Sequence, residues 1–229
     1  MKKLCVVLPA FNEEAVIGQV LTSVKKELEN LPGWQAQLVV VDDGSHDRTG
    51  QVARKAGAIV LRHVLNRGLG GAISTGMGYA KKINANILVT IDSDGQHDPE
   101  DIKKVIGPIL EGRADVVIGS RLFDRKKMPL DRLIISWGGS ILTFFLFRIW
   151  TTDSQSGFRA FNRKAMQAIQ VKTQGMEVSS ELFGEIKRNG LRLIEVPIKV
   201  IYTEYSRQKG QNNLNAPRVV LKLILRLFR

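Results

Sequence analysis

The segment ILVTIDSDGQHDPEDI, residues 87–102, places five acidic side chains directly after a continuous apolar run. Like charges at close range disfavour one another's ionisation, and a cation usually offsets such a cluster. In Asp92-Ser93-Asp94, two short oxygen ligands lie one residue apart and can reach a shared site. Hard cations such as Mg²⁺ take such oxygens together with substrate phosphates. The pattern therefore indicates a divalent-metal site.

Three other polar clusters follow apolar runs in the same way: LPAFNEE at 8–14, VVDDGSHDRT at 40–49 and GSR at 119–121. Each cluster alone is typical of a solvated loop. Ligands of open α/β sheets bind at the carboxyl ends of the strands, where such loops meet. The four clusters together therefore predict one functional edge on one sheet.

The apolar periodicity supplies the elements that position these clusters. It predicts strands at 4–8, 38–41, 59–62, 87–91 and 116–118, with apolar residues at helical spacing between Val16 and Leu28. Asp47 is expected to open a second helix, and Asp98-Pro99-Glu100 reads as a helix cap with an acidic first turn. Strands that alternate with helices in this way predict an α/β fold with a Rossmann-like, mostly parallel, doubly wound sheet.

The composition and net charge of the chain indicate which classes of partner it can bind. The chain has 229 residues, 44% of them hydrophobic, and its 34 Lys and Arg exceed its 22 Asp and Glu to give a net charge of +12. This excess predicts an anionic partner, but no nucleic-acid reading motif accompanies it, so we expect no nucleic acid. The single cysteine, Cys5, excludes an intrachain disulfide and favours a reducing compartment. The short apolar start runs straight into acids, so we expect no secretory signal.

The second half of the chain contains two segments of a different kind. Residues 133–150 are apolar and aromatic but include Gly138, Gly139 and Arg148, so we expect an interfacial or core helix rather than a membrane span. The end, NAPRVVLKLILRLFR, is typical of a basic amphipathic helix that lies on a membrane. Between them, SGFRAFNRKAMQAI predicts a strand leading into a helix, and LRLIEVPIKVIYT predicts a closing strand.

The chain lacks the glycine loops that bind nucleotides in other α/β proteins. No G-x-G-x-x-G follows the first predicted strand, where Pro9-Ala10-Phe11-Asn12-Glu13 stands instead, and no Walker loop is present. Any phosphate at the predicted edge must therefore be bound by groups other than a glycine-rich loop.

Taken in order, LPAFNEE, VVDDGSHDRT, NRGLGGA, IDSDGQHDPE, GSR and DSQSGFRAF resemble the motifs of the family 2 glycosyltransferases of the GT-A fold. The resemblance extends from about Leu4 to Gly210 and is strongest to members that glycosylate dolichyl and other polyprenyl phosphates. It implies inverting transfer of a sugar from a UDP- or GDP-linked donor to a lipid phosphate, with Mg²⁺ or Mn²⁺ as the cofactor.

The resemblance also assigns residues. It implies that Asp94 and Gln96 bind the metal. It implies that residues near the nucleobase, ribose, sugar and phosphates bind substrate: Pro9, Phe11, Glu13, Val41, Asp43, Asp92, Ser93, Arg121, Arg132, Arg207 and Lys209. Phe11 stands where the mannosyltransferases usually have tyrosine, and Asn212 and Asn213 stand where they have Ser-Lys.

Asp153 matches the family's acidic residue near the acceptor, and we predict it to be catalytic. A hydroxyl nucleophile would need a base there, whereas a phosphate is already ionised, so orienting the acceptor or a basic side chain is the alternative role. Asp42 is more simply read as a turn residue and His46 as a loop residue. His97 is equally suited to capping the next helix or to contacting a ligand.

We therefore expect a GT-A domain over 1–212, with a donor half at about 1–122 and an acceptor half at about 123–212. A basic amphipathic tail follows at 213–229. The expected partners are a nucleotide sugar, a polyprenyl phosphate and the membrane surface, with a small anchoring subunit as a further candidate. The expected location is the cytoplasmic face of the membrane or the cytoplasm. The rivals are a soluble family 2 enzyme acting on a polysaccharide or glycan, and a silent nucleotide-binding scaffold or nucleic-acid binder.

Overall fold

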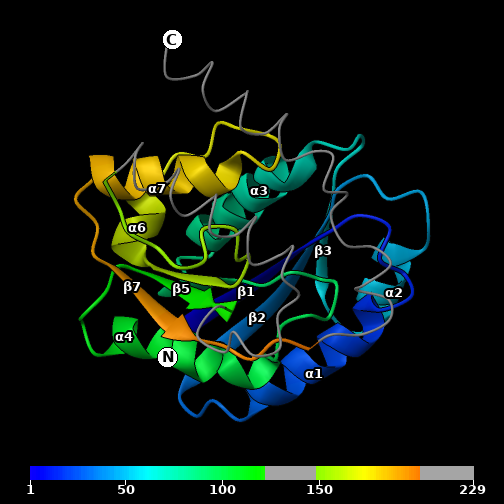
Figure 1. The fold of residues 1–229 in the computed structure, drawn as a ribbon. Coiled ribbons are helices and arrows are strands. Elements are labelled where there is room, and N and C mark those ends of the chain that lie inside the picture. The colour runs from blue at the N-terminus through cyan, green and yellow to red at the C-terminus, as the bar shows by residue number, and fades with distance from the viewer. Residues whose placement is uncertain (122–147, 202–229) are drawn as a thin grey trace.

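The computed structural model describes residues 1–121 and 148–201. A seven-stranded sheet in the order β3-β2-β1-β4-β6-β5-β7 forms its centre (Figure 1). The strands are β1 (Lys2–Ala10), β2 (Trp34–Asp42), β3 (Ile59–Arg62), β4 (Ile87–Thr90), β5 (Val116–Ser120), β6 (Arg159–Asn162) and β7 (Leu193–Pro197). The predicted strands are confirmed, within a few residues at their ends.

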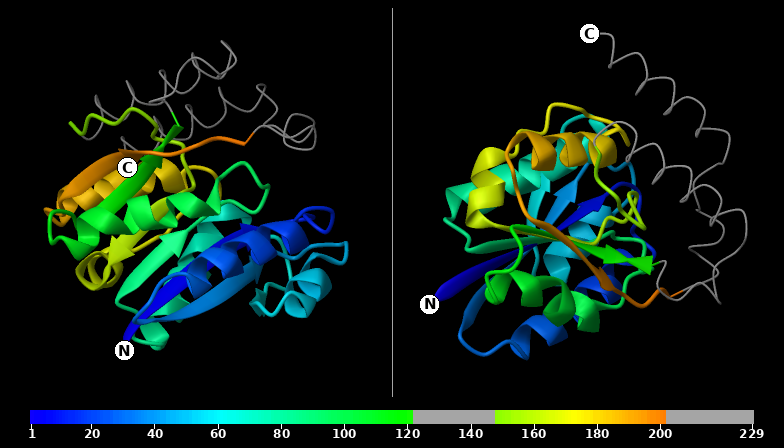
Figure 2. Two further views of the ribbon diagram at one scale, coloured as in Figure 1. Left: turned by 90° about the horizontal axis from the view of Figure 1, so that it is seen from below. Right: turned by 60° about the vertical axis from the view of Figure 1, so that its left-hand side comes forward.

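Helices cover both faces of the sheet, as Figures 1 and 2 show. They are α1 (Ile17–Glu29), α2 (Thr49–Lys55), α3 (Gly68–Lys82), the 3₁₀ turn η1 (Pro99–Asp101), α4 (Ile102–Leu110), α6 (Arg163–Ala168) and α7 (Val178–Arg188). No helix among these combines the length and hydropathy needed to cross a bilayer.

The two-residue period of β1 divides the core. Leu4, Val6 and Leu8 pack with α1, α2 and α4 on one face. Cys5 and Val7 pack with α3, α6 and α7 on the other. Because successive side chains of a strand point to opposite faces, a run that is apolar throughout can be buried only between two helical layers. This confirms the doubly wound α/β prediction.

The strand β6 departs from the simple parallel pattern. It runs antiparallel to both of its neighbours, β4 and β5, while the remaining pairs are parallel. Its amino end therefore lies at the edge where β4 and β5 end. The turn that precedes β6 is thereby brought to the same edge as the loops that follow the parallel strands.

Two local predictions can be compared with the structure. Asp98 caps η1 by accepting a hydrogen bond from Glu100 N at 3.0 Å, as predicted. The helix expected over 133–150 is wrong for its last three residues, because Arg148, Ile149 and Trp150 are non-helical and Arg148 has a φ of +54°. Most of that segment, the predicted tail and the domain boundary at 212 lie outside the described residues.

Candidate active site

The loops after β1, β2 and β4 are joined to one another at the carboxyl edge of the sheet. Glu13 N donates to Thr49 Oγ1 at 2.7 Å, and Ser93 Oγ donates to Pro9 O at 2.7 Å. Glu13 and Ser93 are both buried. The predicted convergence of polar clusters on one edge is thus observed for these loops.

The residues predicted to surround a nucleotide lie on this edge in different environments. Phe11 is 39% exposed and makes a T-shaped contact with the ring of His46, with centroids 6.2 Å apart. The Val41 side chain is buried in the core layer of α3. Any ligand contact of Val41 would therefore come from its backbone, whereas the Phe11 side chain is open to solvent.

Asp43 is buried and holds the turn between β3 and α3. Its carboxylate accepts hydrogen bonds from Arg67 N at 2.9 Å and Gly68 N at 2.7 Å, and it contacts His63 Nδ1 at 2.6 Å. His63 Nε2 contacts Thr75 Oγ1 in turn at 2.8 Å. The carboxylate is therefore anchored from three sides, which fixes the shape of this part of the edge before any ligand binds.

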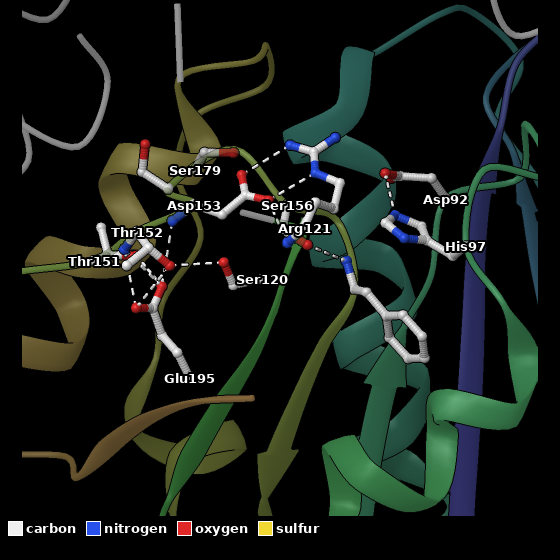
Figure 3. Close-up of polar contacts among 12 residues, drawn as sticks. Asp92, His97, Ser120, Arg121, Thr151, Thr152, Asp153, Ser156, Ser179 and Glu195 are labelled. Carbon is white, nitrogen blue, oxygen red and sulfur yellow. Dashed lines mark hydrogen bonds and ion pairs between the residues drawn. The ribbon is translucent and has the colours of Figure 1, made fainter. Parts of the chain in front are cut away.

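The loop after β4 carries the predicted metal ligands. Gln96 N donates to Asp94 Oδ1 at 2.9 Å, and the Gln96 side-chain amide donates to Asp94 Oδ2. Asp92 Oδ2 contacts His97 Nε2 at 3.0 Å (Figure 3). His97 is buried and packs edge-on against Phe158. His97 thus orients Asp92, and Asp98 supplies the cap that His97 was also suited to provide.

The two aspartates of this loop differ in how they are stabilised. Burial opposes ionisation of Asp92, but the hydrogen bond and charge of His97, with the charges of Arg121 and Arg159, outweigh it and keep the pKa of Asp92 below its ordinary value. Burial and the negative charge of Asp92 raise the pKa of Asp94. A cation placed beside Asp94 would offset both effects by stabilising the charged carboxylate.

The donor set of this loop fits a hard divalent cation. Asp94 offers a carboxylate that its surroundings disfavour as an anion, and Gln96 offers an amide oxygen once that side chain turns from its bond with Asp94. No group of three or more His, Cys, Asp or Glu suited to a metal occurs within residues 1–121 and 148–201. A cation held by Asp94 and Gln96 alone would complete its shell with water and phosphate oxygens, as Mg²⁺ usually does.

Arg121 and Asp153 form a bidentate ion pair at the ends of β5 and of the turn before β6 (Figure 3). Arg121 Nε and Nη2 donate to the carboxylate at 2.7 and 2.8 Å, and Arg121 N donates at 3.1 Å. Burial alone would raise the pKa of Asp153, but the charge and hydrogen bonds of Arg121 outweigh it and lower the pKa. Asp153 is thus a weak base that holds a guanidinium in place.

Comparison with known proteins decides the family. Residues 5–170 match the model described as "Glycosyl transferase family 2". The chain belongs to glycosyltransferase family 2.

Relatives and a solved structure agree with this assignment. The transferase is 35% identical to the UDP-N-acetylglucosamine–dolichyl-phosphate N-acetylglucosaminyltransferase of Methanococcus voltae, over 98% of this chain and 96% of the relative. It is 29% identical to the undecaprenyl-phosphate mannosyltransferase of Micrococcus luteus, over 95% and 91%. Glucosyl-3-phosphoglycerate synthase from Mycobacterium tuberculosis, solved with Mn²⁺ and UDP-glucose, superposes with a TM-score of 0.70 at 22% identity over 97% of this chain and 77% of that chain. The fold is GT-A.

Arg159 is a buried cation of this glycosyltransferase that the sequence did not single out. Its Nη2 donates to Ser154 O at 3.0 Å and to Ser179 Oγ at 3.2 Å. Burial lowers the pKa of Arg159 to about 10, and the charges of Asp92 and Asp153 oppose that effect. Arg159 thus balances the carboxylates of both loops from inside the protein. An arginine within the otherwise apolar run GFRAF is the signal that could have indicated it.

The remaining predictions concern Asp42 and three basic residues, Arg132, Arg207 and Lys209. Asp42, the last residue of β2, is fully buried, accepts from Ser45 N at 3.0 Å and lies 3.6 Å from Arg62 Nε, and these contacts agree with its interpretation as a turn residue. Arg132, Arg207 and Lys209 lie outside the described residues. Their predicted place near the phosphates stays a prediction.

Proposed function

We propose that this enzyme transfers a sugar from a nucleotide-sugar donor to a polyprenyl phosphate, with a divalent metal as cofactor. The observation that carries the proposal is the Arg121–Asp153 pair. A hydroxyl acceptor would need a base at the acceptor side, but Asp153 is buried, bonded at both oxygens and has a lowered pKa. A phosphate acceptor is already ionised near neutral pH and needs no base. The acceptor side thus suits a phosphate better than a hydroxyl.

In this mechanism the chain supplies position and charge. Asp94 and Gln96 would hold Mg²⁺ or Mn²⁺, and Asp92 with Ser93 would contact the donor. The ion, when bound, would offset charge that develops on the departing diphosphate. Arg121, held by Asp153, keeps a positive charge at the end of β5 for the phosphates. The proposed nucleobase and ribose contacts are those predicted above: Pro9, Phe11, Glu13, Val41 and Asp43.

The names of the relatives support a lipid acceptor. Two relatives that align over nine-tenths or more of their own length are named as transferases of sugars to polyprenyl phosphates. The donor nucleotide and the sugar are left open between UDP- and GDP-linked hexoses, because the two relatives are named for different sugars. The soluble rival, transfer to a glycan, is the principal alternative outcome.

A lipid acceptor implies action at a membrane surface, and we propose its cytoplasmic face. The basic and apolar segments at 133–150 and 217–229 support this proposal from sequence. Each basic residue near an anionic membrane surface contributes about 1 kcal/mol of binding free energy, and salt screens this attraction. Apolar side chains buried in the membrane contribute binding free energy that salt does not remove. Binding to anionic vesicles should therefore weaken but persist at high salt, and changing Leu223, Leu227 and Phe228 to Ser should remove the persistent part. A membrane-anchoring subunit has no support among the described residues.

The direct test is a donor panel. The purified enzyme with Mn²⁺ and a polyprenyl phosphate is incubated with a series of UDP- and GDP-sugars, and lipid-linked sugar is measured. We expect product with one donor or a small group of donors. Transfer to a soluble glycan, with none to the lipid phosphate under any donor, would replace this proposal by its rival.

A further inference from the structure

Glu195, in β7, binds the turn that carries Asp153 (Figure 3). Its Oε1 accepts hydrogen bonds from Thr151 Oγ1, from Thr152 N at 3.0 Å and from Asp153 N at 3.3 Å. Its Oε2 accepts from Thr152 N at 2.9 Å and Thr152 Oγ1 at 3.2 Å. One carboxylate therefore gathers donors from three consecutive residues of the turn.

The hydrogen bonds around Thr152 have a defined direction. Thr152 Oγ1 donates its proton to Glu195, so in its 2.7 Å contact with Ser120 Oγ it must act as the acceptor. Ser120 then donates to Thr152, and Thr152 donates to Glu195. This chain joins the end of β5 to β7 through the turn.

The same turn reaches Arg121. Asp153 gives its backbone N–H to Glu195 and uses its carboxylate to bind Arg121, the residue after Ser120. β5 and β7 are parallel neighbours, with Ile118 opposite Glu195 in the register. Glu195 thus lies in the strand beside the one whose end presents Arg121, and it fixes the turn from that side.

We propose that Glu195 is a positioning residue for the transfer reaction: it fixes residues 151–153 so that Asp153 holds the Arg121 guanidinium in one orientation toward the substrate phosphates. The inference rests on the proposed function. A carboxylate suits this place because the backbone N–H of Thr152 points at both of its oxygens and the backbone N–H of Asp153 points at Oε1, and these groups can only donate. Glutamine has the same shape, but its amide group would place a donor against these donors. Aspartate keeps both acceptor oxygens on a shorter stem.

The chain offers a matched control in Glu181. Its carboxylate also gathers a loop, accepting from Lys172 N at 3.1 Å, Thr173 N at 2.8 Å and Thr173 Oγ1 at 2.6 Å. These bonds hold residues 172–173 rather than the turn at 151–153, so Glu181→Gln should disturb a similar set of bonds at a different place. Equal losses of stability in Glu195→Gln and Glu181→Gln would not affect the test. Only Glu195→Gln should change the orientation of Arg121.

The first test observes Arg121 without any substrate. In ¹⁵N-labelled protein, the Arg121 Nε–H signal, assigned by its loss in Arg121→Lys, should be sharp and slow to exchange because it donates to buried Asp153. We expect it to broaden or vanish in Glu195→Gln, to persist in Glu181→Gln and to recover partly in Glu195→Asp. An unchanged signal in Glu195→Gln would overturn the proposal.

The second test is kinetic. Misplacing a binding group by about 1 Å can cost roughly 100-fold in rate, so Glu195→Gln should lower kcat by about 10- to 100-fold with little change in the KM for the donor, and Glu181→Gln should leave both near the parent values. A parent enzyme without any transfer to a polyprenyl phosphate would defeat the proposed function, yet the Arg121 signal would still decide the role of Glu195. Unchanged kcat in an active Glu195→Gln enzyme would overturn that role.

A milder variant decides the question if Glu195→Gln does not fold. Thr152→Val removes the hydroxyl that joins Ser120 to Glu195 while it keeps the backbone bonds and the carboxylate. We expect a smaller change of the same kind, with a broadened Arg121 signal and kcat lowered about tenfold or less. A sharp Arg121 signal with parent kcat in this variant would count against the proposal.

Discussion

The loop after β4 and the turn before β6 bring carboxylates to the same edge of the sheet, but they satisfy those carboxylates in opposite ways. Asp94 has Asp92 as a neighbour of like charge, and its pKa is raised by burial and by that charge. Asp153 has the Arg121 guanidinium, and its pKa is lowered although it is fully buried. The first region is suited to receive a cation from solution. The second region already contains a cation, the Arg121 guanidinium, and can only hold it toward a substrate.

This difference separates two roles for the carboxylates of this edge, binding a metal and holding a guanidinium. The Asp92–Asp94 loop would act by binding a metal and, through it, the donor diphosphate. The Asp153 turn would act by fixing Arg121, with Glu195 behind it. Substitutions that remove one negative charge should therefore have different consequences in the two regions.

The largest effect should follow loss of the metal ligand. Asp94→Asn removes the charge that balances the divalent ion, and the several kcal/mol that such an ion contributes correspond to a rate loss of about 1,000-fold or more. Steady-state transfer assays with Mn²⁺ measure this. Asp98→Asn is the control in the same loop, because asparagine caps η1 as well as aspartate does. Full parent activity in EDTA would show that transfer does not depend on a metal.

A smaller loss should follow from changing the shape of the held cation. Arg121→Lys keeps a charge near Asp153 but cannot form the bidentate pair, so we expect transfer to fall about 10- to 100-fold. Arg121→Ala is less informative, because an unpaired buried carboxylate would cost about 3–5 kcal/mol of stability.

Arg192→Lys provides the comparison for Arg121→Lys. Arg192 makes a similar pair with buried Asp115, through Nε and Nη2 at 3.1 Å, at the start of β5 rather than its end. The Arg192→Lys variant should be less stable than the parent enzyme but should transfer sugar at the parent rate. If transfer fell equally in both lysine variants, Arg121 would be a structural arginine.

The parallel strands, the polar edge and the acidic loop could be predicted from sequence, because each is encoded locally by an apolar run that ends in a polar cluster. The antiparallel placement of β6 could not be predicted, since it depends on pairing between segments about 70 residues apart, such as Thr90 with Arg159. Glu195 was missed for a related reason. It reads locally as a solvent-facing residue of a closing strand, and only the register of β7 beside β5 brings it under the turn at 151–153.

Stability should change in opposite directions in the two regions. The raised pKa of Asp94 means that its ionisation at neutral pH destabilises the folded protein, so Asp94→Asn should increase the free energy of unfolding when it is measured in chelator. Asp153→Asn should decrease it by about 1.5–3 kcal/mol, because hydrogen bonds to a charged group are lost. Urea unfolding at neutral pH measures both. Changes of the same sign would contradict the contrast.

The smallest expected effect is on the stability of the protein at acid pH. Because the pKa of Asp153 is lowered on folding, its contribution to stability is fully present above the ordinary aspartate value of about 3.9 and is lost as pH falls through the lower folded value. Asp153→Asn should therefore show a shallower loss of stability below about pH 4 than the parent. Parallel curves for parent and variant, from urea unfolding at stepped pH, would mean that the pair does not lower this pKa.

The most direct test of the central claim compares two acceptors that differ only in the phosphate. The enzyme, with Mn²⁺ and its active nucleotide sugar, is given a polyprenyl phosphate in one assay and the corresponding polyprenol in the other. Because Asp153 is bonded to Arg121 and is a weak base, we predict glycosylation of the phosphate and no detectable glycosylation of the alcohol. Transfer to the polyprenol at a comparable rate would show that the acceptor side activates a hydroxyl, and would contradict the proposed role of the Arg121–Asp153 pair.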